Sequence, residues 1–148
     1  MKTRISIQES DFNLASEIAA LNADGTGAIA TFTGLVRPDD NLTSLTLEHY
    51  PQMTEREIAR IADDAQTRWP LLAVTIVHRI GRLTPGDNIV FVGVAAAHRS
   101  AAFAACEFLM DYLKTNAPFW KQEERGGASS WVEAKSSDDR AAERWQKK

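Results

Sequence analysis

The segment that most constrains the fold is residues 89–94, IVFVGV, which is almost entirely apolar. A strand without polar positions has no face for water, so this pattern predicts a central strand that is covered on both faces. The segment 99–115 follows closely with the apolar spacing of a helix, and Asn116 and Pro118 are expected to end that helix. Its buried stripe is predicted to contain Phe103, Cys106, Met110 and Leu113.

Other segments alternate between apolar and polar residues or repeat at helical spacing. Strands are predicted at 27–34, 45–50 and 74–80, and helices at 11–22 and 54–69. Because strands and helices are mixed and few βαβ units are present, the pattern favours an α+β fold over a doubly wound parallel sheet. No repeat or linker divides the sequence, so one domain is expected over residues 1–148.

Composition narrows the possible functions. The net charge of −3 argues against general nucleic-acid binding, which needs a basic surface. No run approaches the roughly 18 apolar residues of a membrane-spanning helix, and the first residues lack the apolar stretch of a secretory signal. A single cysteine rules out an internal disulfide and fits a reducing cytoplasm.

Four cationic or proton-donating side chains bracket the helix predicted at 99–115. His98 and Arg99 stand at its start, where backbone N–H groups favour an anion, and Lys114 and Lys121 stand around its end. Such groups can bind an anionic substrate and transfer protons. Burial or a neighbouring cation lowers the pKa of a lysine toward the range in which it can transfer protons at neutral pH. The alternative for Lys114 is a solvated side chain that stabilises the helix C-terminus. The alternative for His98 and Arg99 is a histidine buried in the core beside an arginine on the surface.

The spacing between these groups limits how they can act together. Fifteen residues separate Arg99 from Lys114, which corresponds to roughly 22 Å along a helix axis. One small ligand cannot touch both side chains of the same chain. The sequence therefore predicts either two separate sites or a symmetric dimer that brings His98 and Arg99 of one protomer to the lysines of the other, and we favour the dimer.

The remaining polar candidates carry less weight. Arg37 lies in a turn after a predicted strand, which is a common place for site residues. Cys106 falls on the apolar stripe of the helix, so a core thiol is favoured over a nucleophile. His49 and His78 occupy inward strand positions and are expected in the core, and the sequence has no histidine and cysteine spacing typical of a zinc site.

Several blocks of unusual composition follow one another from about residue 27 to 145. They are TFTG with VR (31–34, 36–37), LTLEHYP (45–51), HRIG (78–81), PGD (85–87), AHRS (97–100), DYLK (111–114), APFWK (117–121) and WVEA (131–134). In this order and over nearly the whole chain, these blocks resemble the large, catalytic subunit of the molybdopterin synthase family.

The resemblance implies an α/β-hammerhead fold with a mixed sheet and flanking helices. It also implies a central homodimer with a small ubiquitin-like sulfur-carrier subunit at each end, which together form a heterotetramer. The implied activity is that of a sulfurtransferase in molybdenum cofactor biosynthesis, which uses the C-terminal thiocarboxylate of the carrier to convert cyclic pyranopterin monophosphate into molybdopterin. No cofactor, metal, nucleic acid or membrane is implied, and a cytoplasmic enzyme is expected.

By their positions in these motifs, Lys114 and Lys121 match the catalytic lysines of the family. The substrate-binding residues that the resemblance implies are Leu35, Val36, Arg37, His98, Arg99, Lys114, Lys121, Gln122 and Glu123. Leu35 stands where a lysine is common in the family, so a non-catalytic dimeric receptor for a ubiquitin-like carrier tail is the alternative function. A phosphate-binding enzyme without a carrier ranks behind both, because the sequence has no glycine-rich cradle.

Overall fold

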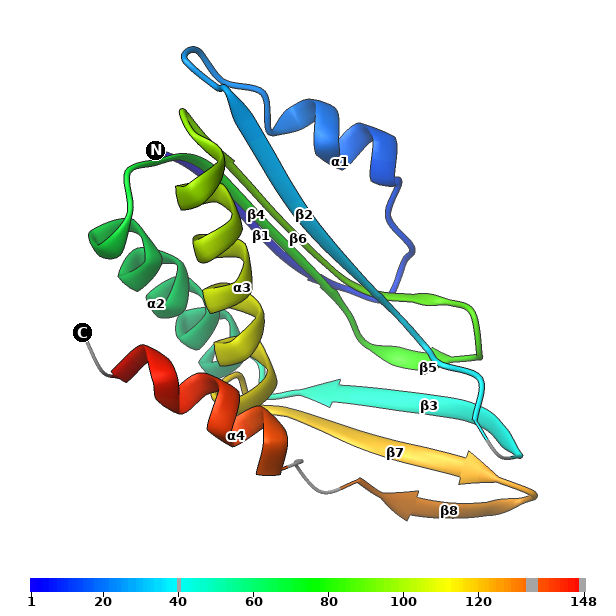
Figure 1. Cartoon of the computed structure of the whole chain (residues 1–148). Helices are drawn as coiled ribbons and strands as arrows, with labels where there is room; N and C mark the ends of the chain where they lie inside the picture. The colour runs from blue at the N-terminus through cyan, green and yellow to red at the C-terminus, as the bar shows by residue number, and fades with distance from the viewer. Residues whose placement is uncertain (40, 133–135, 147–148) are drawn as a thin grey trace.

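The computed structural model describes residues 1–39, 41–132 and 136–146, and its strands form two sheets beside a layer of helices (Figure 1). The strands are β1 (Lys2–Gln8), β2 (Ala28–Leu35), β3 (Leu42–His49), β4 (Leu71–Arg79), β5 (Gly81–Leu83), β6 (Asn88–Ala96), β7 (Phe119–Arg125) and β8 (Ala128–Trp131). The helices are α1 (Leu14–Ala20), α2 (Met53–Arg68), α3 (Arg99–Thr115) and α4 (Ser136–Glu143), and a 3-10 turn follows at Arg144–Gln146. The α+β class predicted from the sequence is confirmed.

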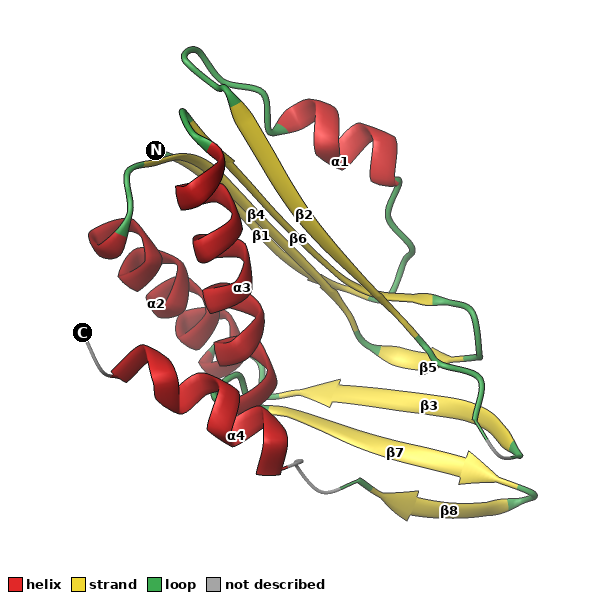
Figure 2. Cartoon of the chain, viewed as in Figure 1, coloured by secondary structure: helices red, strands yellow, loops and turns green. Residues whose placement is uncertain are grey.

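The first sheet has the strand order β1-β4-β6-β2, with β1 parallel to β4 and the other neighbours antiparallel. Successive side chains of the inner strand β6 point to opposite faces of the sheet. Val92 and Val94 pack in the larger core with α2 and α3, whereas Phe91 and Ala95 pack with Leu21 on the face beside α1 (Figure 2). The prediction of a central strand covered on both faces is therefore confirmed.

The second sheet is antiparallel, with the strand order β5-β3-β7-β8. The sequence pattern does not predict β7, because its residues FWKQEER are mostly charged or polar and have no apolar alternation. Pairing with β3 sets Lys121 opposite Leu47 and Glu123 opposite Leu45. The turn to β8 is made by Gly126 and Gly127, whose positive φ angles a glycine adopts without strain.

Helix α3 has the predicted bounds, and its C-terminus is capped where the backbone N–H of Asn116 donates to the carbonyl of Tyr112. The predicted stripe is wrong at Phe103, which is 66% exposed. The buried side chains of the helix are Ala102, Ala105, Cys106, Phe108, Leu109 and Leu113. The buried face of the helix thus includes the small residues Ala102 and Ala105, and Phe103 lies outside it. Within the described residues, no helix combines the length and apolar character needed to cross a membrane.

Candidate functional site

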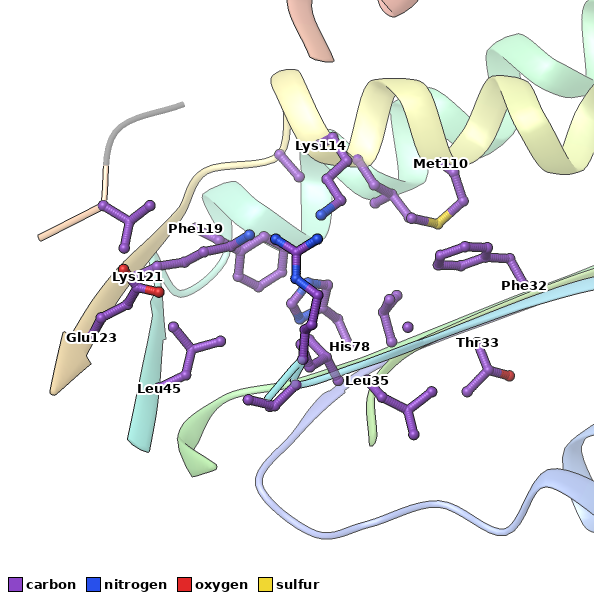
Figure 3. A pocket seen from close by; sticks show the side chains of 18 of the residues that line it. Phe32, Thr33, Leu35, Leu45, His78, Met110, Lys114, Phe119, Lys121 and Glu123 are labelled. Carbon is purple, nitrogen blue, oxygen red and sulfur yellow. The ribbon is translucent and has the colours of Figure 1, made fainter. Parts of the chain in front are cut away.

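A cavity of about 550 Å³ lies where the two sheets meet the C-terminal end of α3 (Figure 3). Its lining comes from the ends of β2, β4 and β6, from β3 and β7, and from the last turn of α3. A small core of Val36, Leu45, Leu47 and Leu83 joins the sheets beside it. The cavity is therefore assembled from segments that are far apart in the sequence.

Two lysines enter this cavity from different elements. Lys114 comes from the last turn of α3 and Lys121 from the third position of β7, and both line the cavity. Figure 3 shows the two side chains extending toward each other over the rings of His78 and Phe119. Lys121 is half-buried, whereas Lys114 is exposed, contrary to the partly desolvated surroundings expected for both. The predicted pairing of these lysines at one cavity is nevertheless present.

The alternation of β7 decides which of its side chains reach the cavity. Phe119, Lys121 and Glu123 line it, and Gln122 lies on the opposite face of the strand because successive strand residues point in opposite directions. The carboxylate of Glu123 also forms an ion pair with Arg125 at 2.9 Å. Gln122 is therefore not among the lining residues within one chain, and its role in substrate binding stays a prediction, whereas Glu123 lies at the cavity as expected.

The end of β2 supplies a second side of the cavity through Leu35, Val36 and Arg37. Val36 is buried, and its backbone N–H donates to the carbonyl of Asp87 at 2.8 Å, which anchors the segment to the turn before β6. The flanking side chains of Leu35 and Arg37 are exposed at the cavity. The structure thus brings these three predicted residues together with Lys114 and Lys121.

His78 is buried, as the sequence predicts, and it also lines the cavity. Its ring stacks on Phe119 with centroids 3.8 Å apart and an interplanar angle of 15°, and its Nδ1 lies 2.9 Å from the carbonyl oxygen of Arg79. Burial, with smaller contributions from the charges of Lys121 and Lys114, lowers the pKa of His78 from 6.5 to about 4. In the sequence, the signal for a role of His78 at the site is its place as a polar ring near the end of a mostly apolar strand.

His98 and Arg99 lie at the opposite end of α3, away from the two lysines. Both side chains are exposed. His98 borders a separate hollow of about 400 Å³ that is lined by Trp69, Pro70, Ala97, Ser100, Ala101 and Ala104. Within one chain, the structure does not bring His98 and Arg99 to the lysine cavity, as the rise of the helix predicts.

The chain offers no accessible thiol for covalent chemistry. Cys106 is buried in the larger core, and burial raises the pKa of its thiol to about 11. The side chain therefore stays protonated at neutral pH, and its prediction as a core thiol is confirmed. Over the residues that the structure describes, no three His, Cys, Asp or Glu side chains gather as a metal-ligand group.

Comparison with known proteins agrees with this architecture. A family model described as "MoaE protein" matches residues 7–116. The molybdopterin synthase catalytic subunit of Vibrio cholerae is 54% identical over 99% of this chain and 100% of its own length. The solved structure of molybdopterin cofactor biosynthesis protein E from Burkholderia multivorans has 51% identity and a TM-score of 0.85, covering 99% of this chain and 98% of that chain.

A more distant solved structure shares the fold. In the complex of subunits 1 and 2 of molybdopterin-converting factor from Helicobacter pylori, one chain has a TM-score of 0.76 at 20% identity, covering 90% of this chain and 92% of that chain. The family model and the 54% identity of the Vibrio relative confirm the resemblance stated from the sequence motifs. This chain belongs to the MoaE family, the family of the molybdopterin synthase catalytic subunit.

Proposed function

We propose that this protein is the catalytic subunit of a molybdopterin synthase. It transfers sulfur from the C-terminal thiocarboxylate of a small ubiquitin-like carrier to cyclic pyranopterin monophosphate, which forms the dithiolene of molybdopterin. The observation that carries this proposal is the convergence of Lys114, Lys121 and Arg37 on one cavity in a member of the MoaE family. A reducing cytoplasm is the proposed location, because the reaction consumes a thiocarboxylate.

The charges of the cavity suit both reactants. A phosphate and a thiocarboxylate are anions, for which Arg37 offers a planar, bidentate donor and each lysine a compact positive charge. The sulfur of the carrier is itself the nucleophile, so the enzyme needs no activated cysteine or serine of its own. The burial of Cys106 is compatible with this chemistry.

The two lysines take different roles because their surroundings differ. Lys114 is exposed at the end of α3 and can follow the incoming tail. We assign it to stabilising the tetrahedral oxyanion and the acyl intermediate that follows it, and to transferring protons. Lys121 is fixed on a paired strand and is half-buried, so it holds the carrier tail or the substrate. Neither role requires a cofactor or a metal.

A homodimer completes the site in this proposal. The two ends of α3 are too far apart for His98 and Arg99 to reach the lysine cavity of their own chain. In a symmetric dimer, the same pair from the partner contacts the cavity, and the two-fold axis repeats the arrangement. A small carrier subunit bound to each protomer makes the assembly a heterotetramer.

The decisive experiment is turnover by the Lys114→Ala variant with a thiocarboxylated carrier and cyclic pyranopterin monophosphate. Loss of a charge that stabilises an oxyanion should reduce product formation at least about 100-fold. The matched control is Lys2→Ala, which removes an exposed lysine of β1. Lys2 pairs with Ala73 near the start of β4, whereas the cavity lies near the end of that strand at His78. Near-normal turnover by Lys114→Ala, or an equal loss in Lys2→Ala, would contradict the proposed role.

Mixing two inactive variants tests the shared site. Lys114→Ala and His98→Ala each damage both sites of their own homodimer. A mixed dimer contains one site with both residues intact, so an equilibrated equal mixture should recover about a quarter of wild-type activity. No recovery beyond the sum of the separate variants would show that the two residues do not act across a dimer.

A non-catalytic receptor for a carrier tail is the second candidate. The observation that favours it is Leu35, which is 52% exposed at the cavity and has no charge where the family commonly has a lysine. Binding of a thiocarboxylated carrier without formation of molybdopterin would support the receptor. The Leu35→Lys variant then shows whether the missing charge is the reason.

A further inference from the structure

We propose that His78 is a positioning residue of the cavity, whose Nε2 accepts a hydrogen bond from an ammonium group of the Lys114–Lys121 pair and orients that pair toward the ligand. The ligand and the turnover rest on the proposed function, whereas the hydrogen bond is a property of the protein alone. The supporting observations are the tautomer, the rigid mounting and the electrostatic surroundings of the ring.

The hydrogen bond to the backbone fixes the tautomer of His78. A carbonyl oxygen can only accept, so Nδ1, 2.9 Å from the oxygen of Arg79, carries the proton. Among the described residues, every fully buried side-chain nitrogen or oxygen has a hydrogen-bond partner. With the proton on Nδ1, Nε2 carries a lone pair that can accept a hydrogen bond, and His78 lines the same cavity as Lys114 and Lys121.

Stacking and burial also hold the ring in place. Phe119 stacks on it at 3.8 Å between centroids, and both residues sit on strands that are paired with neighbours. His78 is 9% exposed, so little space is left for another ring orientation. A side chain mounted in this way can fix the position of a flexible partner such as a lysine ammonium group.

Burial keeps the ring neutral, because it is the largest cause of the lowered pKa of His78. The hydrogen bond to the carbonyl of Arg79 acts in the opposite direction, and the positive charges of Lys121, Lys114 and His49 lower the pKa further. Arg37 contributes another positive charge to the same cavity. A neutral imidazole can accept from an ammonium group without adding a cation, and its low affinity for protons makes it a poor proton shuttle at neutral pH.

Nitrogen NMR on wild-type protein labelled with ¹⁵N-histidine tests the hydrogen bond without any assay of turnover. We expect the His78 signals of a neutral ring with the proton on Nδ1, assigned with the His49→Gln and His98→Gln variants. Replacing the donor lysine in Lys114→Met or Lys121→Met should move the Nε2 signal downfield, whereas Lys2→Met should leave it unchanged. A proton on Nε2, or no response to either cavity lysine, would overturn the proposal.

Two variants connect the hydrogen bond to turnover. His78→Phe keeps an aromatic ring against Phe119 but removes both nitrogens, and it should lower kcat about 10-fold to 100-fold at unchanged carrier affinity. His78→Gln offers an amide oxygen in place of Nε2 and should recover kcat to within about 3-fold of wild type. Full activity of His78→Phe, or equal losses in both variants, contradicts the proposal. If wild-type protein makes no product, the proposed function fails and the NMR result still decides the role of His78.

Discussion

The two sheets differ in how they are buried. In the first sheet, β6 is buried along most of its length, with cores on both faces. In the second sheet, every residue of β8 is exposed and β7 is half-buried with mainly polar side chains. Apolar burial contributes roughly 25 cal/mol per Å², so the first sheet supplies most of the stability, and β7 and β8 contribute little.

The cavity lies at the boundary between these regions and uses both. His78 and Val36 come from or adjoin the buried sheet and are held in place by packing and backbone hydrogen bonds. Lys121 and Glu123 come from the half-exposed strand, where charged side chains are tolerated. A rigid apolar side and a polar side thus meet at one site, and changes on the two sides should have different consequences.

The largest expected effect is on the buried sheet. Phe91→Ala removes a fully buried ring from the central strand and should reduce the free energy of unfolding by about 3–5 kcal/mol. The matched control, Trp131→Ala on β8, removes a 59% exposed ring and should change it by less than about 1 kcal/mol. Urea unfolding of both variants gives the comparison, and equal losses would contradict the division between the sheets.

The next effect is a dependence of stability on pH at the boundary. Burial lowers the pKa of His78 from 6.5 in the unfolded chain to about 4 in the folded protein. As pH falls from 6.5 to 4, the unfolded state gains protons first, so the free energy of unfolding decreases by up to about 3 kcal/mol. Above pH 6.5 this residue makes no pH-dependent contribution.

Urea unfolding at several pH values between 7 and 4 checks this prediction. The His78→Gln variant lacks the titrating group and should lose less stability than wild type over that interval. If the two proteins lose the same amount, another residue is responsible for the acid sensitivity.

The sequence predicts the buried elements better than the exposed ones, for a physical reason. The apolar run of β6 and the helical spacing of α3 reflect burial, which the sequence records directly. Strand β7 is not predicted because its pairing with β3 is made by backbone groups, which leave no pattern in the sequence. Its side chains FWKQEER face the cavity or the solvent and are mostly polar. The stripe of α3 is misplaced at Phe103 because its buried face includes the small Ala102 and Ala105 as well as large residues.

The site shows the same limit. The motifs and the charges identify Lys114, Lys121 and Arg37, and the rise of a helix correctly separates them from His98. The motif places Gln122 beside Lys121, but it does not show that the alternation of β7 turns the two side chains to opposite faces. His78 is assigned to the core because burial and a role in the cavity give the same pattern in a sequence.

A smaller effect is expected where α2 joins the second sheet. The buried hydroxyl of Thr54 accepts from the backbone N–H of Tyr50 after β3 and donates to the carbonyl of Pro118 before β7, each at 2.9 Å. Thr54→Val keeps the shape but leaves both backbone groups without this partner, and it should reduce the free energy of unfolding by about 1–3 kcal/mol.

Thr54→Ser is the control for this junction, because it keeps the hydroxyl group and should lose less stability than the valine variant. Thermal unfolding of the two variants measures the difference. A valine variant as stable as wild type would show that water or a shift of the backbone replaces both hydrogen bonds.

The smallest effect should be confined to the edge of the second sheet. Gly127 has a φ angle of +86° with no atom within 4 Å of an added Cβ, so Gly127→Ala meets backbone strain alone. A strain of about 1 kcal/mol should raise hydrogen exchange of the β8 amides about 5-fold. The β6 amides should be unaffected, because they exchange through opening of the buried sheet, and Ser129→Ala in β8 should change neither group. Equal acceleration in β6 would mean that the hairpin and the buried sheet open together, against the separation argued from their burial.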